Sequence, residues 1–276
     1  MPENARWHSP LRCSVQVVDH SLSALLVLPV VLLAARLRWL SVSGAVAAFV
    51  VGWVTIAAGG WQAASVLLAF FITSSALSRW RAERKRRMES LTARGARRGA
   101  VQVFANGGVA TLCVALYGVT GDAHWWLAFA GAYAAANADT WSSEVGMLSR
   151  TPPRHILTGR LLQAGDSGGV TPVGLLAGCA GSAIVAGAAW LVYPVPLQQA
   201  LAVALGGIAG NLLDSVLGGT LQARYRCVRC GEAVERREHC GSPAQHIAGW
   251  RRINNDVVNL LCTLAGALVG FIVARI

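Results

Sequence analysis

Five short polar segments lie between or at the ends of long apolar stretches in this sequence, at 106–108, 137–146, 165–174, 211–219 and 254–259. Four of them carry acids that lie among asparagine, serine and glycine: Asp139, Glu144, Asp166, Asp214 and Asp256. The other eight acids lie in the N-terminal tail, in an outer turn or in arginine-rich loops, which is typical of a solvated surface with weak ion pairs. The polar segments are therefore where chemistry is expected.

Helical spacing places several of these polar side chains on common faces. Residues three or four positions apart are neighbours on a helix, so Asn211, Asp214 and Ser215 share one face. Asp139 and Ser143 have the same spacing. Polar and ionisable groups at membrane depth are costly, and they usually face the bundle interior or a wet cavity. The five segments therefore predict one shared functional cavity rather than five separate helix contacts.

Carboxylates, asparagines and glycine turns beside basic loops suit a magnesium ion and phosphate groups. Mg²⁺ prefers oxygen ligands and usually keeps positions for water and phosphates. Glycine-rich turns that open a helix offer backbone N–H groups and a favourable dipole to phosphate. We therefore expect phosphoryl transfer, which is catalysed mainly by positioning and charge neutralisation.

This interpretation assigns each polar residue a role. The expected catalytic Mg²⁺ ligands are Asp139, Glu144, Asp214 and Asp256. The residues expected to bind substrate or nucleotide are Asn106, Asn137, Ser143, Gly165, Asp166, Gly168, Gly169, Asn211, Ser215, Asn255 and Asn259. Arg160 and the arginines at 94–98 are candidates for neutralising the transferred group, and the sequence does not choose among them.

Familiar motifs for such substrates are missing from the sequence. It has no Gly-x4-Gly-Lys-Ser/Thr loop, and its only lysine, Lys85, lies in an arginine run. The Asp-Asp-x-x-Asp pattern of prenyltransferases and the Asp-rich signature of CDP-alcohol phosphotransferases are also missing. Any nucleotide must therefore be held without a Walker motif.

Several ordered motifs resemble those of the phytyl-phosphate kinase / transmembrane protein 19 family. They are Gln102-Val-Phe-Ala-Asn106-Gly-Gly108-Val, Asp139-Thr-Trp-Ser-Ser-Glu144-Val-Gly146, Gly-Gly-Val-Thr-x-x-Gly at 168–174, and Asn255-Asp256-Val-Val-Asn259. The resemblance covers about residues 40–274. The Asp-Thr-x-x-Ser stretch is also similar to the Asp-x-x-Ala-Ser/Tyr stretch of CTP-dependent polyprenol and phytol kinases.

The resemblance implies an integral-membrane kinase. Its substrates would be an isoprenoid monophosphate of the phytyl or geranylgeranyl type and a nucleoside triphosphate, CTP or ATP, and its product the isoprenoid diphosphate. The prenyl tail would then lie between helices. One departure from the family pattern is Asp166, where the resemblance predicts a threonine after Gly165. An acid there is either an extra ligand or a change in nucleotide handling.

The elements that must position these residues are membrane-spanning helices. Hydrophobic residues make up 54% of the 276 residues and charged residues only 13%, whereas soluble domains carry about 25% charge. This composition excludes a soluble enzyme, a disordered chain and a secreted disulfide scaffold. Apolar blocks long enough to span a bilayer as helices lie at about 21–35, 42–58, 61–78, 101–119, 124–140, 171–193, 197–222 and 256–274.

The expected fold is all-α: a single integral-membrane domain over residues 1–276, with about eight spans, or seven if the first, which contains Pro29, does not cross. The longer loops would lie at about 79–100, 141–170 and 223–253.

Of the 24 basic residues, 21 lie on the side of these loops and three, Arg6, Arg12 and Arg275, on the other. The positive-inside rule then places the loops and the site in the cytoplasm, in what we interpret as a prokaryotic cytoplasmic membrane. The net charge of +11 is explained by orientation and lipid headgroups rather than by nucleic acid.

The 223–253 loop contains a cluster of cysteines and histidines. Cys227, Cys230 and Cys240, with His239 or His246 as the fourth ligand, have the composition of a tetrahedral structural zinc site. Adjacent ligands at 239 and 240 are strained, which keeps His246 as an alternative. Idle thiols in a reducing compartment and a redox pair also remain open.

A transporter of a phosphorylated or anionic solute is the competing function, with the polar segments as its pathway. Transporters usually place ionisable groups near the membrane midplane and often show inverted repeats. The acids here gather at one face, and no inverted repeat is evident in the sequence. A non-catalytic lipid scaffold is a third class. The sequence favours the kinase over both.

Overall fold

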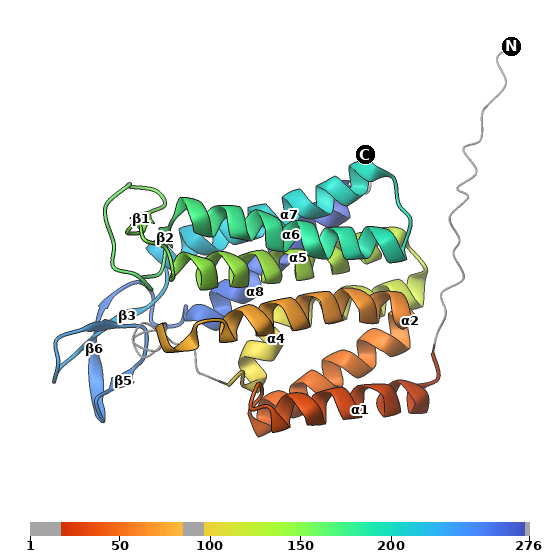
Figure 1. Cartoon of the computed structure of the whole chain (residues 1–276), viewed down its shortest axis with the longest axis horizontal. Helices are drawn as coiled ribbons and strands as arrows, with labels where there is room; N and C mark the ends of the chain where they lie inside the picture. Colours follow the sequence, from red (N-terminus) through yellow and green to blue (C-terminus); the bar gives the residue numbers. More distant parts are fainter. Residues whose placement is uncertain (1–17, 85–96, 274–276) are drawn as a thin grey trace, which may run out of the picture.

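The computed structural model describes residues 18–84 and 97–273, and the described chain is mostly helical (Figure 1). Its helices are α1 (His20–Arg36), α2 (Val42–Arg79), α4 (Ala100–Thr120), α5 (Ala123–Gly146), α6 (Pro172–Val192), α7 (Leu197–Thr220) and α8 (Asn255–Val273). The bounds lie within a few residues of the predicted ones, except that α5 continues to Gly146. The last turns of α5 therefore carry Ser143 and Glu144, which were expected to lie beyond the helix.

Helix α2 consists of two legs that meet at Gly60. The backbone of Gly60 has φ 64° and ψ −158°, a conformation that a side chain would disfavour. The chain reverses there, so the two legs run antiparallel (Figure 1). The guanidinium of Arg79 lies 4.3 Å from the ring centre of Trp39, which brings both ends of α2 to the same end of the bundle. The two spans predicted on either side of this position thus form a hairpin.

Helix α5 is the core of the bundle. Residues 126–139 are buried without interruption, and α2, α4, α6, α7 and α8 all contact this helix. Among the described residues, five helices are long and apolar enough to cross a membrane: α2, α4, α6, α7 and α8. The prediction of about eight spans is confirmed only in part, because α1 is short and α5 is not apolar enough. Since α5 is enclosed by protein, it does not need lipid-compatible side chains.

Glycines allow the other helices to approach the α5 backbone very closely. A Cβ on Gly131 of α5 would lie 2.3 Å from the carbonyl oxygen of Gly266 in α8, and a Cβ on Gly266 would lie 2.4 Å from the carbonyl oxygen of Gly131. On α7, a Cβ on Gly207 would lie 2.8 Å from Ala134. These contacts leave no room for even one methyl group.

Two small antiparallel sheets show that the expected all-α class is wrong for the loops. β1 (Arg154–His155) pairs with β2 (Gly169–Val170). A four-stranded sheet of order β4-β3-β6-β5 is built from β3 (Arg224–Cys227), β4 (Ala233–Val234), β5 (Glu238–His239) and β6 (Ser242–Ala248). In β3, Tyr225 and Cys227 are buried while Arg226 between them is exposed, and this short alternation is the strand signal in a loop otherwise interpreted only by its cysteines.

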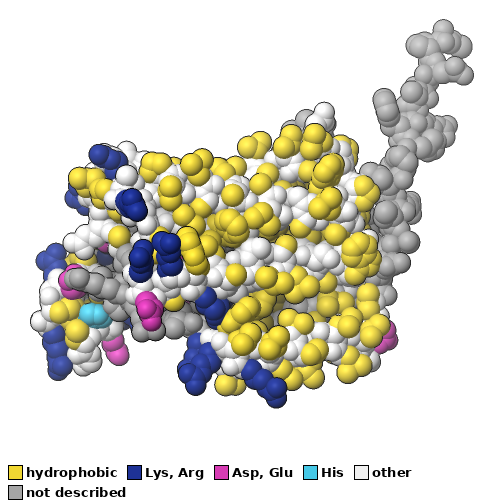
Figure 2. Space-filling view, in the orientation of Figure 1, with side chains coloured by type: hydrophobic (Ala, Val, Ile, Leu, Met, Phe, Trp, Pro, Cys, Tyr) yellow, Lys and Arg dark blue, Asp and Glu magenta, His cyan; other side chains and the backbone are white. Residues whose placement is uncertain are grey.

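Charged side chains concentrate at the end of the bundle that carries the strands. Figure 2 shows apolar side chains over the helices and arginines and acids gathered mainly at this end. The described parts of the loops predicted for one side of the membrane lie together there (Figure 1). The chain is therefore built as an apolar bundle with one polar end.

The glycine contacts lead to a prediction with a matched control. Gly131→Ala should destabilise the protein by about 1–3 kcal/mol, because α5 and α8 must move apart. Gly187→Ala, in α6, should instead stabilise by up to about 1 kcal/mol, because open space surrounds that position and alanine is the better helix former. Thermal unfolding of both variants in detergent would test this, and a similar shift for both would contradict the packing.

Candidate functional site

A cavity of about 320 Å³ opens at the polar end of the bundle. Its walls are the ends of α2, α5 and α7, the starts of α4 and α8, and the 164–171 segment that leads into α6. The expected site residues that line it are Asn106, Asp139, Ser143, Glu144, Gly165, Asp166, Gly168, Gly169, Asn211, Asp214, Ser215, Asn255 and Asn259. Residues separated by up to 153 positions in the sequence thus share one space.

Acids occupy the wall formed by α5 and α7. Asp139 and Glu144, in the last turns of α5, are only 5% and 7% exposed. The Ser143 hydroxyl lies 3.5 Å from the Asp139 carboxylate and donates to it. Asp214 reaches the cavity from the last third of α7. This wall presents several carboxylate oxygens in a largely buried setting.

Arginines occupy the wall formed by the α1–α2 connection, the end of α2 and the start of α4: Arg38, Arg79 and Arg98 line the cavity. The Arg79 side chain donates to the Ser75 carbonyl oxygen at 2.9 Å and stacks on Trp39. The backbone N–H of Arg98 donates to the Trp39 carbonyl oxygen at 3.2 Å. Of the arginines considered from the sequence, Arg98 lines the cavity, Arg97 and Arg160 do not, and Arg94 lies outside the described residues. Arg38 and Arg79 were missed.

The starts of three helices, α4, α6 and α8, lie at the cavity. Thr171 lines it and caps α6 by accepting a hydrogen bond from the Gly174 N–H at 3.0 Å. Asn255 is the first residue of α8, and Gln102 lies in the first turn of α4. Helix starts carry partial positive charge and spare N–H groups, both of which favour a bound anion.

The glycine turn at 165–169 packs against α7 and against the four-stranded sheet β4-β3-β6-β5, here called the Cys-rich sheet. Gly168 has φ 78°, and a Cβ on it would lie 2.3 Å from the Cα of Gly219. Asp166, the departure from the family pattern, accepts from the Arg224 guanidinium at 3.1 Å. Its side chain thus pairs with the sheet. Ser167 donates to Glu235, which also lines the cavity and which sequence reasoning had placed among surface acids.

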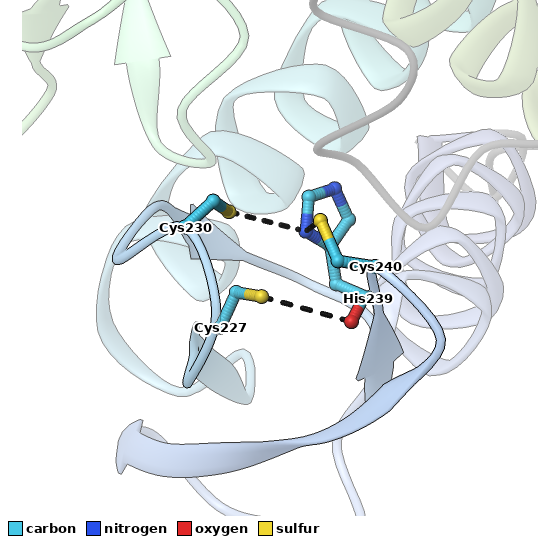
Figure 3. Close-up of side chains that lie close together, drawn as sticks. All are labelled: Cys227, Cys230, His239 and Cys240. Atoms are coloured by element: carbon cyan, nitrogen blue, oxygen red, sulfur yellow. Dashed lines mark hydrogen bonds between the residues drawn. The ribbon is translucent and has the colours of Figure 1, made fainter.

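A separate cluster of sulfur and nitrogen atoms lies in the four-stranded sheet. Figure 3 shows Cys227 and Cys230 facing His239 and Cys240 across the sheet's two turns. One ligand atom from each of the four lies within 4.8 Å of the others. Cys240 has φ 54°, a left-handed backbone that lets the adjacent His239 and Cys240 both point inward. The expected strain between neighbouring ligands thus takes the form of an unfavourable backbone conformation at Cys240.

His246, the alternative fourth ligand, lies outside this cluster. Its ring packs edge-on to Tyr225, with ring centres 5.4 Å apart. A hydrogen bond from the Cys230 backbone N–H lowers the pKa of the Cys227 thiol to about 6, and the neighbouring Cys230 thiol raises that of Cys240 to about 11. The lowered pKa of Cys227 favours the thiolate form, which is the form that metals bind.

Comparison with known proteins identifies the family. Residues 25–267 match the family described as Integral membrane protein DUF92. This chain belongs to that family. Protein PGR of Arabidopsis thaliana is 34% identical over 251 residues, which cover 82% of this chain and 85% of the relative. An uncharacterised membrane protein of Methanocaldococcus jannaschii is 28% identical, covering 91% of this chain and 92% of the relative.

A third relative, Protein VTE6, chloroplastic, of Arabidopsis thaliana, is 24% identical over 86% of this chain and 66% of its own length. Together these matches confirm the family that the motifs indicated, that of phytyl-phosphate kinase and transmembrane protein 19. No solved structure matches this chain.

Two expected site residues of this DUF92 chain lie away from the cavity. The Asn137 amide donates to the Gly181 carbonyl of α6 at 2.9 Å and accepts from the Thr73 hydroxyl of α2 at 3.1 Å. It is fully buried and joins three helices, so the structure gives it a packing contact rather than a place on the cavity wall. Asp256 is half-buried in the first turn of α8 and does not line the cavity.

The two asparagines should therefore differ in their effect on stability. Asn137→Ala should destabilise the protein by about 1 kcal/mol, the usual size for side-chain hydrogen bonds between membrane helices. Asn106→Ala should have little effect, because within residues 18–84 and 97–273 the Asn106 amide bonds only to the Gln102 carbonyl of its own helix. Thermal unfolding of both variants in the same detergent would test this, and an equal loss for the two would contradict it.

Proposed function

We propose that this protein is a membrane kinase that transfers a phosphoryl group from a nucleoside triphosphate to an isoprenoid monophosphate. The observation that supports this most strongly is that one cavity is lined both by the acids of α5 and α7 and by the arginines at the end of α2 and before α4. A magnesium-bound nucleotide and an anionic acceptor need both kinds of wall. The relation to the phytyl-phosphate kinase family supports the same chemistry.

The donor atoms of the acid wall fit a magnesium ion. Asp139, Glu144 and Asp214 offer carboxylate oxygens, and the Oδ1 of Asn259 is buried without a hydrogen-bond partner among the described residues. An oxygen-only set of this kind is what Mg²⁺ prefers, and the ion would neutralise phosphate charge when bound. Asp256 has no part in this assignment, because it lies off the cavity.

The remaining cavity residues would hold the phosphates. Arg38, Arg79 and Arg98 would neutralise charge on the transferring group and the acceptor, while the starts of α6 and α8 offer backbone N–H groups. Gly168 and Gly169 allow the main chain to approach a phosphate closely. The acceptor is already an anion and needs little help from a base, so positioning and charge neutralisation should supply most of the rate. The positive-inside pattern supports a cytoplasmic cavity, where nucleotides are found.

Loss of a carboxylate should remove turnover without unfolding the protein. Asp139→Asn and Asp214→Asn should each lower kcat by about 100-fold or more, the usual cost of deleting one electrostatic contact to a transition state. Asp122→Asn, at the exposed far end of the bundle, is the matched control and should keep full activity.

Nucleotide consumption with geranylgeranyl or phytyl monophosphate measures this effect. Near-normal activity in both cavity variants would show that the site is misassigned. A wild type that never consumes nucleotide but moves an anionic solute across liposomes would replace the kinase with a transporter.

We also propose that the sheet cluster binds one structural zinc ion through Cys227, Cys230, His239 and Cys240. Three thiolates and one imidazole, converging from two turns, are a common donor set for tetrahedral structural zinc. No cavity-lining residue belongs to this set, which supports a structural rather than a catalytic ion.

The zinc assignment predicts about one zinc per chain in freshly purified, reduced protein. Cys230→Ser should lose most of this metal and should lower the unfolding temperature, because the sheet has only a small apolar core. Cys179→Ser, which changes an exposed cysteine of α6, should retain both metal and stability. Elemental analysis would test this, and metal-free wild-type protein would rule the assignment out.

A further inference from the structure

An apolar groove of about 240 Å³ lies beside the polar cavity, between α1, both legs of α2 and α4. Its walls are valine, leucine, isoleucine, alanine and phenylalanine side chains, with few polar groups. Three of the polar residues that line it, Arg98, Gln102 and Asn106, also line the polar cavity. The two spaces therefore meet at these residues, which places a charged pocket at the head of a hydrocarbon-lined groove.

We propose that this groove binds the hydrocarbon tail of the isoprenoid phosphate, with the phosphate held near Arg98 and Asn106. This inference rests on the proposed kinase function and adds the position and size of the tail site. A molecule with one anionic end and one long apolar end matches the two joined spaces better than a nucleotide or a sugar phosphate does. An ordinary membrane lipid is the competing occupant.

The depth of the groove indicates the length of the tail. Leu40 lies near its mouth, while Ile56 and Ala64 lie near its floor, each four residues from Gly60 at the turn of the α2 hairpin. The helix rise of 1.5 Å per residue places the floor about 20 Å from the start of α2. This depth matches an extended chain of about four isoprene units.

The groove is also open toward the lipid. Leu26 and Val30 of α1 and Leu68 of α2 line it and are 51%, 43% and 38% exposed. Figure 2 shows that the surface over α1 is largely apolar. A tail can therefore pass from the bilayer into the groove sideways, without leaving an apolar environment.

Ala64 is the residue that should set the maximum length. It is a small side chain at the floor, which the larger Ile56 lines from the other leg of α2. Ala64→Phe would fill the deep end of the groove, while Ile56→Ala would extend it. Neither change touches the polar cavity. Ala180→Phe, on the exposed face of α6 and away from both cavities, is the matched control for adding a phenyl ring to the protein.

The test uses monophosphates of two, three and four isoprene units, with nucleotide consumption as the readout. Ala64→Phe should lower kcat/KM for the four-unit substrate about tenfold or more relative to the two-unit substrate, since apolar pockets discriminate by about that factor for small size differences. Ile56→Ala should shift the preference toward longer chains. Ala180→Phe should leave the ratio unchanged.

A second readout separates this inference from the kinase proposal. Thermal stabilisation by the same monophosphates, without nucleotide, should follow the same order of chain lengths in each variant. If the wild type is stabilised by long isoprenoid phosphates but consumes no nucleotide, the proposed tail site is supported and the proposed kinase function is wrong. If Ala64→Phe is active with an unchanged length preference, or if bilayer phospholipid stabilises all variants equally and chain length has no effect, the tail site is wrong.

Discussion

The fold depends on enclosing α5 within other helices at backbone-contact distance. Lipid tails are as apolar as leucine, so no hydrophobic force between helices drives such packing, and it must come from close van der Waals contact. The glycine pair Gly131 and Gly266 provides that contact on the α8 side, and Gly207 does so on the α7 side. Because α5 is shielded from lipid, it can carry asparagine, aspartate and glutamate into the bundle. The acid wall is a consequence of this shielding.

The direction of each helix shows which charged side chains of the cavity interact unfavourably with the helix dipole. A helix is partially negative at its C-terminus, so an acid in the last turn is disfavoured, as Glu144 is on α5. Arg98, beside the partially positive start of α4, is also on the unfavourable end. Asp256 is different, because an acid in the first turn of α8 is favourable and needs no further explanation. Arg79, in the last turn of α2, is favourably placed as well. Of the charges that line the cavity, helix dipoles therefore leave Glu144 and Arg98 unexplained.

Much of the site could be predicted from the sequence, because the polar segments are conspicuous in an apolar chain. Because polar groups are costly in contact with lipid, most of these segments must face one another inside the bundle. The misses have physical reasons. Asn137 and Asn106 are the same residue type in similar surroundings, and only the contacts to Thr73 and Gly181 separate a packing asparagine from a cavity one. Arg38 and Arg79 were counted only as topology signals. In the Cys-rich sheet the alternation in β3 covers only a few residues, too few to predict the whole sheet.

The junction of the two cavities lies where the physics of the proposed substrates requires it. A nucleotide with its metal carries charges that would be very costly to bring into a low-dielectric interior, whereas a long prenyl chain is costly to hold in water. An enzyme joining the two must place the reacting phosphates where helices end and the tail between helices. The polar cavity is formed by helix ends, and the apolar groove continues from Arg98 and Asn106 into the hairpin of α2. The reversal at Gly60 brings the two legs of α2 together at the far end of that groove, and Ala64, which follows it, is where the proposed tail site should limit the length of the chain.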